Sequence, residues 1–154
     1  LKIMQNINIK QKGAYIMKQQ LKNFIKNYPN HGLSQAVINY VGEEEFLERA
    51  ADVAIHGADG GAFTSFIYYD DTLPFALDNY DSIKQCLKQH ADDFGVNLID
   101  ILSGFTCLKN IDADDIAEAF YTKDPNHKYY TDVFNALAWF AAELVAYDFY
   151  QSQE

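Results

Sequence analysis

Two carboxylate–histidine pairs are the strongest candidates in this chain for a metal-binding or catalytic site. Asp52 and His56 lie four residues apart in a stretch of helical periodicity, so both side chains could hold one metal ion or share a hydrogen bond. His90 and Asp93 form a second pair. A small metal-dependent enzyme around Asp52, His56 and His90 is one alternative function. A carboxylate–histidine pair on a helix surface is commoner, and we predict no metal or other cofactor.

No catalytic motif accompanies these pairs. The glycine run at residues 57–61, GADGG, lacks the pattern of a phosphate-binding loop, and the acids around it would repel phosphate. No serine lies in a Gly-x-Ser-x-Gly turn, and neither cysteine lies in a nucleophile motif. Cys86 is expected in the core, whereas Cys107 could be exposed. We therefore predict no catalytic residue, and a binding protein rather than an enzyme.

The element that must organise the chain is a helix expected over residues 131–150, TDVFNALAWFAAELVAYDFY. It is apolar on almost every side, so no solvent face can be drawn on it and it should be buried. Glu143 near its middle and Asp148 near its end argue against a membrane span. The amphipathic helices that precede it are expected to lay their apolar faces against it.

Local signals place those earlier helices. We expect helix starts at Met17, Ser34, Glu43, Thr72, Asp81, Asn97 and Asp112, and helix ends at Pro29, Gly42, Gly57, Gly95 and Gly104. Residues 57–72 resist a helical interpretation because three glycines precede the strand formers FTSFIYY. The prediction is a mainly α protein, a compact bundle of about seven helices around the apolar C-terminal helix. It has at most one short strand or hairpin near residues 62–69.

Charge is distributed unevenly along the 154 residues. Residues 1–28 hold six lysines and no acid, so the rest of the chain holds six bases against 22 acids, a net charge of −16. Such a body repels nucleic acid and anionic membranes and attracts basic protein surfaces, although an acidic surface also serves solubility alone. The lack of paired cysteines and of a signal peptide predicts a cytoplasmic protein. Residues 1–16 carry no clear period and are expected to be a leader that is not native, followed by a single helical domain over residues 17–154.

Two kinds of residue are candidates for contact with a partner. Carboxylates spaced along helices can imitate the phosphates of nucleic acid and occupy the lysines and arginines that bind it. Tyrosines beside acids or lysines, outside the core, are typical of protein-binding surfaces, although an AT-rich genome encodes many tyrosines anyway. The acidic candidates are Glu43, Glu44, Glu45, Glu48, Asp52, Asp70, Asp71, Asp112, Asp114, Asp115 and Glu118, and the aromatic ones are Tyr68, Tyr69, Tyr121, Tyr129 and Tyr130.

The segment GGAFTSFIYYDDT at residues 60–72, followed by HADDFG and ALAWFAAELVA, resembles a family of small proteins encoded by phages, prophages and plasmids. In that family a Gly-Gly-Phe-x-x-Phe-Ile-Tyr-Tyr segment precedes Asp-Thr, and the likeness covers roughly residues 50–148. Here Ala62 is inserted between Gly61 and Phe63. The resemblance implies a mobile genetic element and carries no catalytic assignment.

Context and charge together favour an acidic inhibitor of a host defence nucleoprotein. As an anti-CRISPR or anti-restriction protein it would bind the basic surface of a defence complex, as nucleic-acid mimics do, and would bind neither nucleic acid nor membrane directly. A self-associating protein without enzymatic role, in which exposed tyrosines bury each other in a homodimer, is the other alternative.

Overall fold

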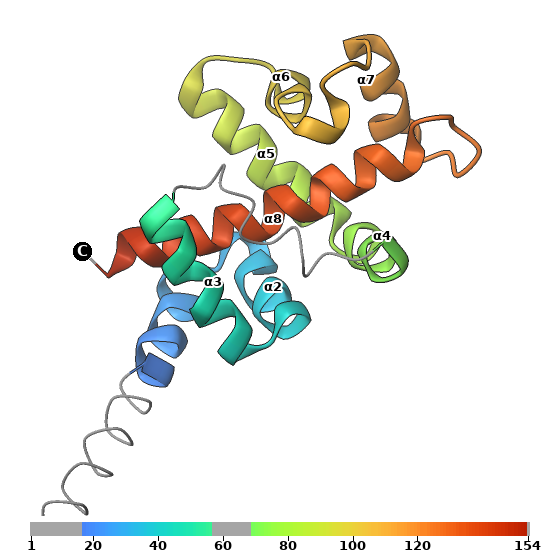
Figure 1. Cartoon of the computed structure of the whole chain (residues 1–154). Helices are drawn as coiled ribbons and strands as arrows, with labels where there is room; N and C mark the ends of the chain where they lie inside the picture. Colours follow the sequence, from blue (N-terminus) through green and yellow to red (C-terminus); the bar gives the residue numbers. More distant parts are fainter. Residues whose placement is uncertain (1–16, 57–68, 154) are drawn as a thin grey trace, which may run out of the picture.

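The computed structural model describes residues 17–56 and 69–153, and it describes their side chains except at residues 51–56 and 69–71. Within these ranges the chain forms eight α-helices and no strand, so the mainly α prediction is confirmed (Figure 1). An N-terminal helix over residues 17–27 comes first. The others are α2 (Leu33–Val41), α3 (Glu43–His56), α4 (Tyr69–Asp78), α5 (Tyr80–Phe94), α6 (Leu98–Ser103), α7 (Ala113–Thr122) and α8 (Tyr130–Ser152), with 3-10 turns η1 (Asn30–Gly32) and η3 (Thr106–Leu108).

The C-terminal helix α8 is the centre of the bundle, as its composition predicts. Twelve of its 23 residues are buried, and it packs against α2, α3, α4, α5, α6, α7 and η3. Figure 1 shows it running across the molecule, with α5, α6 and α7 on one side and α2 and α3 on the other. Alanines on several sides of α8 let neighbouring helices approach its backbone closely. Near its end, the Phe149 ring contacts the Phe24 ring of the N-terminal helix edge-on, with 5.3 Å between centroids.

Several predicted helix starts are wrong by a few residues. Ser34 does not cap α2: it is buried inside the helix, which follows Gly32, and its hydroxyl donates to the main-chain oxygen of Tyr28 (2.6 Å). Asp81 lies in the first turn of α5, whose N-cap position is Asn79. α4 begins at Tyr69 rather than Thr72, so the last residue of the expected strand is helical, and the rest of that expectation lies outside the described residues.

Other local signals are confirmed. Gly95 follows α5 in the left-handed conformation (φ 67°), and Asn97 caps α6 by accepting from the main-chain N–H of Ile99 (2.9 Å). Asp112 occupies the N-cap position of α7, as expected for a helix start, but its side chain makes no capping hydrogen bond.

The turn η1 joins the N-terminal helix to the bundle through three successive residues with positive φ: Asn30 (50°), His31 (57°) and Gly32 (87°). This conformation costs roughly 1–2 kcal/mol at each residue other than glycine. Hydrogen bonds hold the turn in place. The Asn30 amide donates to Asp148 Oδ2 of α8 (3.0 Å), and the Cys86 thiol of α5 donates to the main-chain oxygen of Asn30 (3.4 Å). The turn therefore ties the start of α2 to both α5 and α8.

Among the described helices, none combines the length and the apolar character needed to cross a membrane. This agrees with the expectation drawn from Glu143 and Asp148.

Candidate functional site

Two groups of exposed carboxylates stand on different helices. Glu43, Glu44 and Glu48 are exposed on α3, and we call them the α3 acidic face. The α7 acidic face consists of Asp112, Asp114 and Glu118, which are exposed before and along α7. Two further candidates are half-buried: Glu45, whose Oε2 is buried without a hydrogen-bond partner among the described residues, and Asp115.

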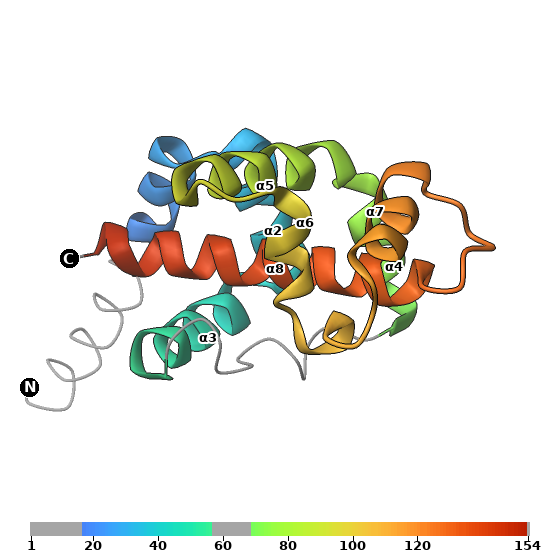
Figure 2. The same cartoon turned by 90° about the horizontal axis from the view of Figure 1, so that it is seen from above.

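The two faces lie apart. α3 packs beside the C-terminal half of α8, whereas α7 lies near the N-terminal end of α8, in both views of the molecule (Figures 1 and 2). Each face repeats its charge after one helical turn, at Glu44 and Glu48 on α3 and at Asp114 and Glu118 on α7. The structure therefore presents two short acidic patches rather than one continuous row of carboxylates.

Cationic partners of these carboxylates are scarce among the described residues. Within the described part of the chain, no lysine or arginine forms an ion pair with any of the six, and the single contact to a basic residue joins Glu118 to His127. The N-terminal ends of α3 and α7 account for part of this pattern, because acids in a first turn interact favourably with the helix dipole. Glu48 and Glu118 lie beyond that first turn, and for them the dipole gives no such explanation.

The remaining candidates for partner contact differ in whether their side chains are described and exposed. Asp52 lies in α3, and Tyr69, Asp70 and Asp71 begin α4, but their side chains are outside the described set, as is Tyr68 altogether. Of the other tyrosines, Tyr121 is exposed (48%), whereas Tyr129 and Tyr130 are half-buried against the core.

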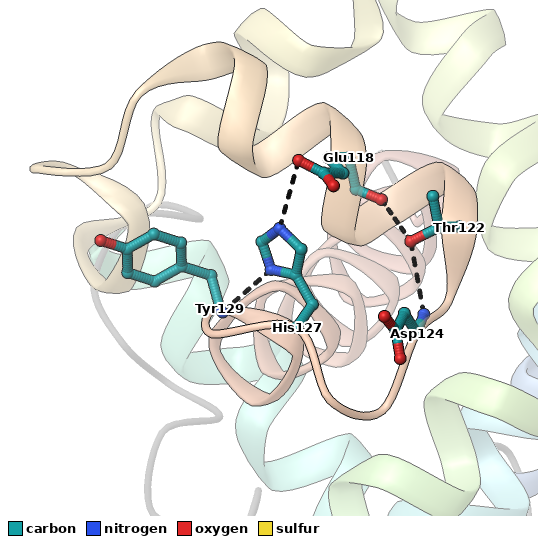
Figure 3. A network of polar contacts seen from close by, with 5 residues as sticks. All are labelled: Glu118, Thr122, Asp124, His127 and Tyr129. Carbon is teal, nitrogen blue, oxygen red and sulfur yellow. Dashed lines mark hydrogen bonds and ion pairs between the residues drawn. The ribbon is translucent and has the colours of Figure 1, made fainter.

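The junction of α7 and α8 holds a polar network that the sequence did not suggest (Figure 3). His127 Nδ1 accepts from the main-chain N–H of Tyr129 (3.1 Å), and His127 Nε2 lies 3.7 Å from Glu118 Oε2. Thr122 and Asp124 make further local hydrogen bonds in the connecting turn. The pairing of Glu118 with His127 arises from the reversal of the chain at this turn, which residue spacing alone does not reveal.

The same junction brings together possible metal ligands. Ligand atoms of Asp115, Glu118 and His127 lie within 4.8 Å of one another. A metal on Nε2 would require the imidazole proton to sit on Nδ1. In this structure Nδ1 accepts a hydrogen bond from the Tyr129 N–H. A proton on Nδ1 would therefore point at that N–H, and the hydrogen bond would be lost. The arrangement fits a histidine that accepts the Tyr129 N–H just before α8 and carries its proton on Nε2, toward Glu118, better than it fits a metal centre.

The predicted enzyme site around Asp52, His56 and His90 gains no support. The side chains of Asp52 and His56 lie outside the described set, and the His90 ring packs against the rings of Phe94 (4.8 Å) and Phe140 (5.9 Å). His90 is half-buried on α5, one turn after Cys86.

A cysteine, a histidine and an acid of the kinds found in cysteine nucleophile sites occur together at Cys86, His90 and Asp148. The thiol, however, lacks the properties of a nucleophile. Burial and, to a smaller extent, the Asp148 carboxylate together raise the pKa of the Cys86 thiol to about 11. A nucleophilic cysteine requires the opposite, a lowered pKa and access to substrate. Cys107 is also half-buried, and burial raises its pKa to about 11. Cys86 lies in the buried core, as the sequence predicts.

Asp148 makes the stability of the fold depend on pH. Burial raises its pKa above the ordinary value of 3.8, although the Asn30 hydrogen bond opposes the shift. Because the pKa of Asp148 is higher in the folded than in the unfolded protein, protonation of its carboxylate stabilises the fold. This contribution is complete at low pH and is lost as the pH rises from 3.8 through the raised pKa. Asp148→Asn keeps an acceptor for Asn30 and removes the charge. We expect the variant to be the more stable protein at pH 7, with a difference that disappears in acid, as measured by urea unfolding between pH 3 and 7.

Comparison with known proteins places the chain in a family. Residues 3–154 match the family described as "Domain of unknown function (DUF7222)". The chain belongs to this family. No curated protein and no solved structure matches it. This member of the DUF7222 family is thus a helical bundle around α8, with its two acidic faces at separate places on the bundle.

Proposed function

We propose that this DUF7222 domain binds the basic surface of a protein that itself binds nucleic acid, through its α3 and α7 acidic faces. The partner that fits the resemblance to proteins of phages and plasmids is a host defence complex of the CRISPR or restriction type. One observation supports this most directly: six exposed carboxylates have no lysine or arginine partner within the described residues. Exposed carboxylates attract a positively charged surface and accelerate its association.

The separation of the two faces limits how mimicry can work. A long phosphate ladder would need carboxylates in one continuous row, and α3 and α7 lie at different places along α8 (Figure 2). Each face instead covers about one helical turn, enough to occupy a local group of lysines and arginines. The domain would then block a basic channel at one point, or bridge two basic patches.

The proposal is tested with purified, guide-loaded CRISPR effectors and restriction endonucleases in DNA-binding competition assays. We expect the domain to displace DNA at low salt and to lose affinity as salt rises, because exposed charges are screened. Neutralising one face, with Glu43→Gln, Glu44→Gln and Glu48→Gln or with Asp112→Asn, Asp114→Asn and Glu118→Gln, removes three exposed contacts of about 0.5 kcal/mol each. The expected result is about tenfold weaker binding for the face that is used.

A matched control removes the same charge elsewhere. Asp78, Asp81 and Asp93 are exposed and belong to neither face, so their replacement by asparagine changes the net charge equally. An equal loss in the control would show a general charge effect and count against both faces. Failure of the wild-type domain to bind any of these complexes at low salt would overturn the proposal.

A further inference from the structure

A groove of about 420 Å³ lies between α5, α6 and α7. Figure 1 shows these helices on the opposite side of α8 from α3. Lys84 and Lys88 line it from α5, one helical turn apart. Val96 and Leu98 supply apolar surface from the α5–α6 connection and α6, and Tyr121 closes it from α7. Val96 (43%) and Tyr121 (48%) are among the most exposed large apolar residues of the described chain.

The connection that forms one wall is held rigidly by backbone hydrogen bonds. At the end of α5, the Gly95 N–H donates to Asp92 O (3.2 Å) and the Val96 N–H donates to Ala91 O (2.9 Å), which is a Schellman motif. The next residue, Asn97, starts α6 with a reciprocal capping box to Asp100. The exposure of Val96 is thus fixed by two adjoining helix caps, and little conformational entropy would be lost there on binding.

The charge of this groove differs from that of the rest of the body. Residues 29–154 contain six bases and 22 acids, and two of the six bases line this one groove. The ammonium group of Lys84 lies 5.3 Å from the centre of the Tyr121 ring, a cation–π arrangement that places positive charge beside an exposed aromatic surface. Asp92 also lines the groove and offsets part of that charge. The combination is two ammonium groups next to an apolar patch.

We infer that this groove binds a short acidic peptide segment of a partner protein that carries an apolar side chain. The partner carboxylates would lie against Lys84 and Lys88, and the apolar side chain against Val96, Leu98 and the Tyr121 ring. A nucleic acid fits less well, because the 22 acids of the body would repel a polyanion beyond the two lysines. The groove shares no residue with the acidic faces, although Tyr121 comes from α7, and its two lysines carry the opposite charge.

The test is a titration of the ¹⁵N-labelled full chain with three hexapeptides, followed by NMR. The first has the sequence Glu-Glu-Leu-Phe-Glu-Glu, the second replaces its glutamates by lysines, and the third replaces Leu-Phe by Gly-Ser. We expect the first peptide to shift the amide signals of Ala91, Val96, Leu98 and Tyr121, and the other two to bind at least about tenfold more weakly. Shifts centred elsewhere, equal binding of the lysine peptide, or no shift at millimolar peptide would each overturn the inference.

Matched variants separate the groove from general charge. Lys84→Glu with Lys88→Glu should weaken binding of the acidic peptide at least about tenfold, and Tyr121→Ala by several-fold. Lys109→Glu with Lys128→Glu changes the net charge equally at two exposed lysines that do not line the groove, and should leave the affinity within about twofold. Equal losses in both double variants would contradict a specific site. The dispersion of the amide spectrum reports whether each variant is folded.

Discussion

Replacing Phe120 by alanine is expected to lower the free energy of unfolding by about 3–5 kcal/mol. Phe120 is completely buried on α7, and its ring lies 5.3 Å from that of Tyr80 on α5. The Tyr80 hydroxyl also donates to the main-chain oxygen of Phe120 (2.8 Å), so the two helices meet at this residue. Truncation removes the apolar contact and leaves a cavity that the surrounding helices cannot fully close. Urea unfolding followed by circular dichroism measures the change.

Phe94 provides the matched control for this truncation. It has the same side chain at the end of another helix, but it is 67% exposed, so Phe94→Ala should change the unfolding free energy by no more than about 0.5 kcal/mol. The dependence of the free energy on urea should stay the same in both variants, which shows that only stability has changed. A loss below about 1 kcal/mol for Phe120→Ala would contradict tight packing around the Phe120 ring.

These two phenylalanines also show what the sequence can and cannot predict. Helical periodicity places both Phe94 and Phe120 on the apolar faces of their helices, and for Phe120 this is right. It is wrong for Phe94, because periodicity indicates which side of a helix is apolar but not how far along the helix its neighbour extends. The last turn of α5 has only partial cover, and the Phe94 ring contacts that of His90 at 4.8 Å.

Helix ends are predicted correctly where a single residue determines the turn, and wrongly where several residues compete for it. Gly95 and Asn97 are correctly predicted, because a left-handed glycine and a capping amide act on their own backbone. Ser34 is a good N-cap by type, but η1 begins the turn earlier and its left-handed residues lead directly into α2. The hydrogen bonds that support η1 come from α5 and α8, which are distant in the sequence.

The same limit applies to the candidate sites. The spacing of carboxylates within α3 and within α7 is a property of each helix and can be predicted. Their placement on separate parts of the bundle depends on how each helix packs against α8, which residue patterns do not encode locally. The pairing of Glu118 with His127 and the groove between α5 and α7 likewise exist only in the folded chain. Sequence reasoning therefore gives the fold class and the acidic residues, and the structure gives their arrangement.

Replacing Asn135 by leucine is expected to raise the free energy of unfolding by about 1–3 kcal/mol. Asn135 is 3% exposed in the first half of α8, and its Oδ1 finds no hydrogen-bond donor among the described residues. A buried polar group without a partner loses its hydration and gains nothing in return. Leucine has a similar size and carries no polar atom, so it should occupy the site without that cost. Urea unfolding again measures the difference.

A control for helix propensity is needed, because leucine favours a helix more than asparagine does. Asn23 is exposed in the N-terminal helix, so Asn23→Leu reports propensity without the change in burial, and only the excess of Asn135→Leu over this control counts. Trp139 lies one turn after Asn135, and its buried Nε1 also lacks a partner within the described chain. One water could accept from Trp139 and donate to Asn135. An excess below about 0.5 kcal/mol would contradict an unsatisfied amide and favour such a bridge, since leucine would then displace a water that satisfies both groups.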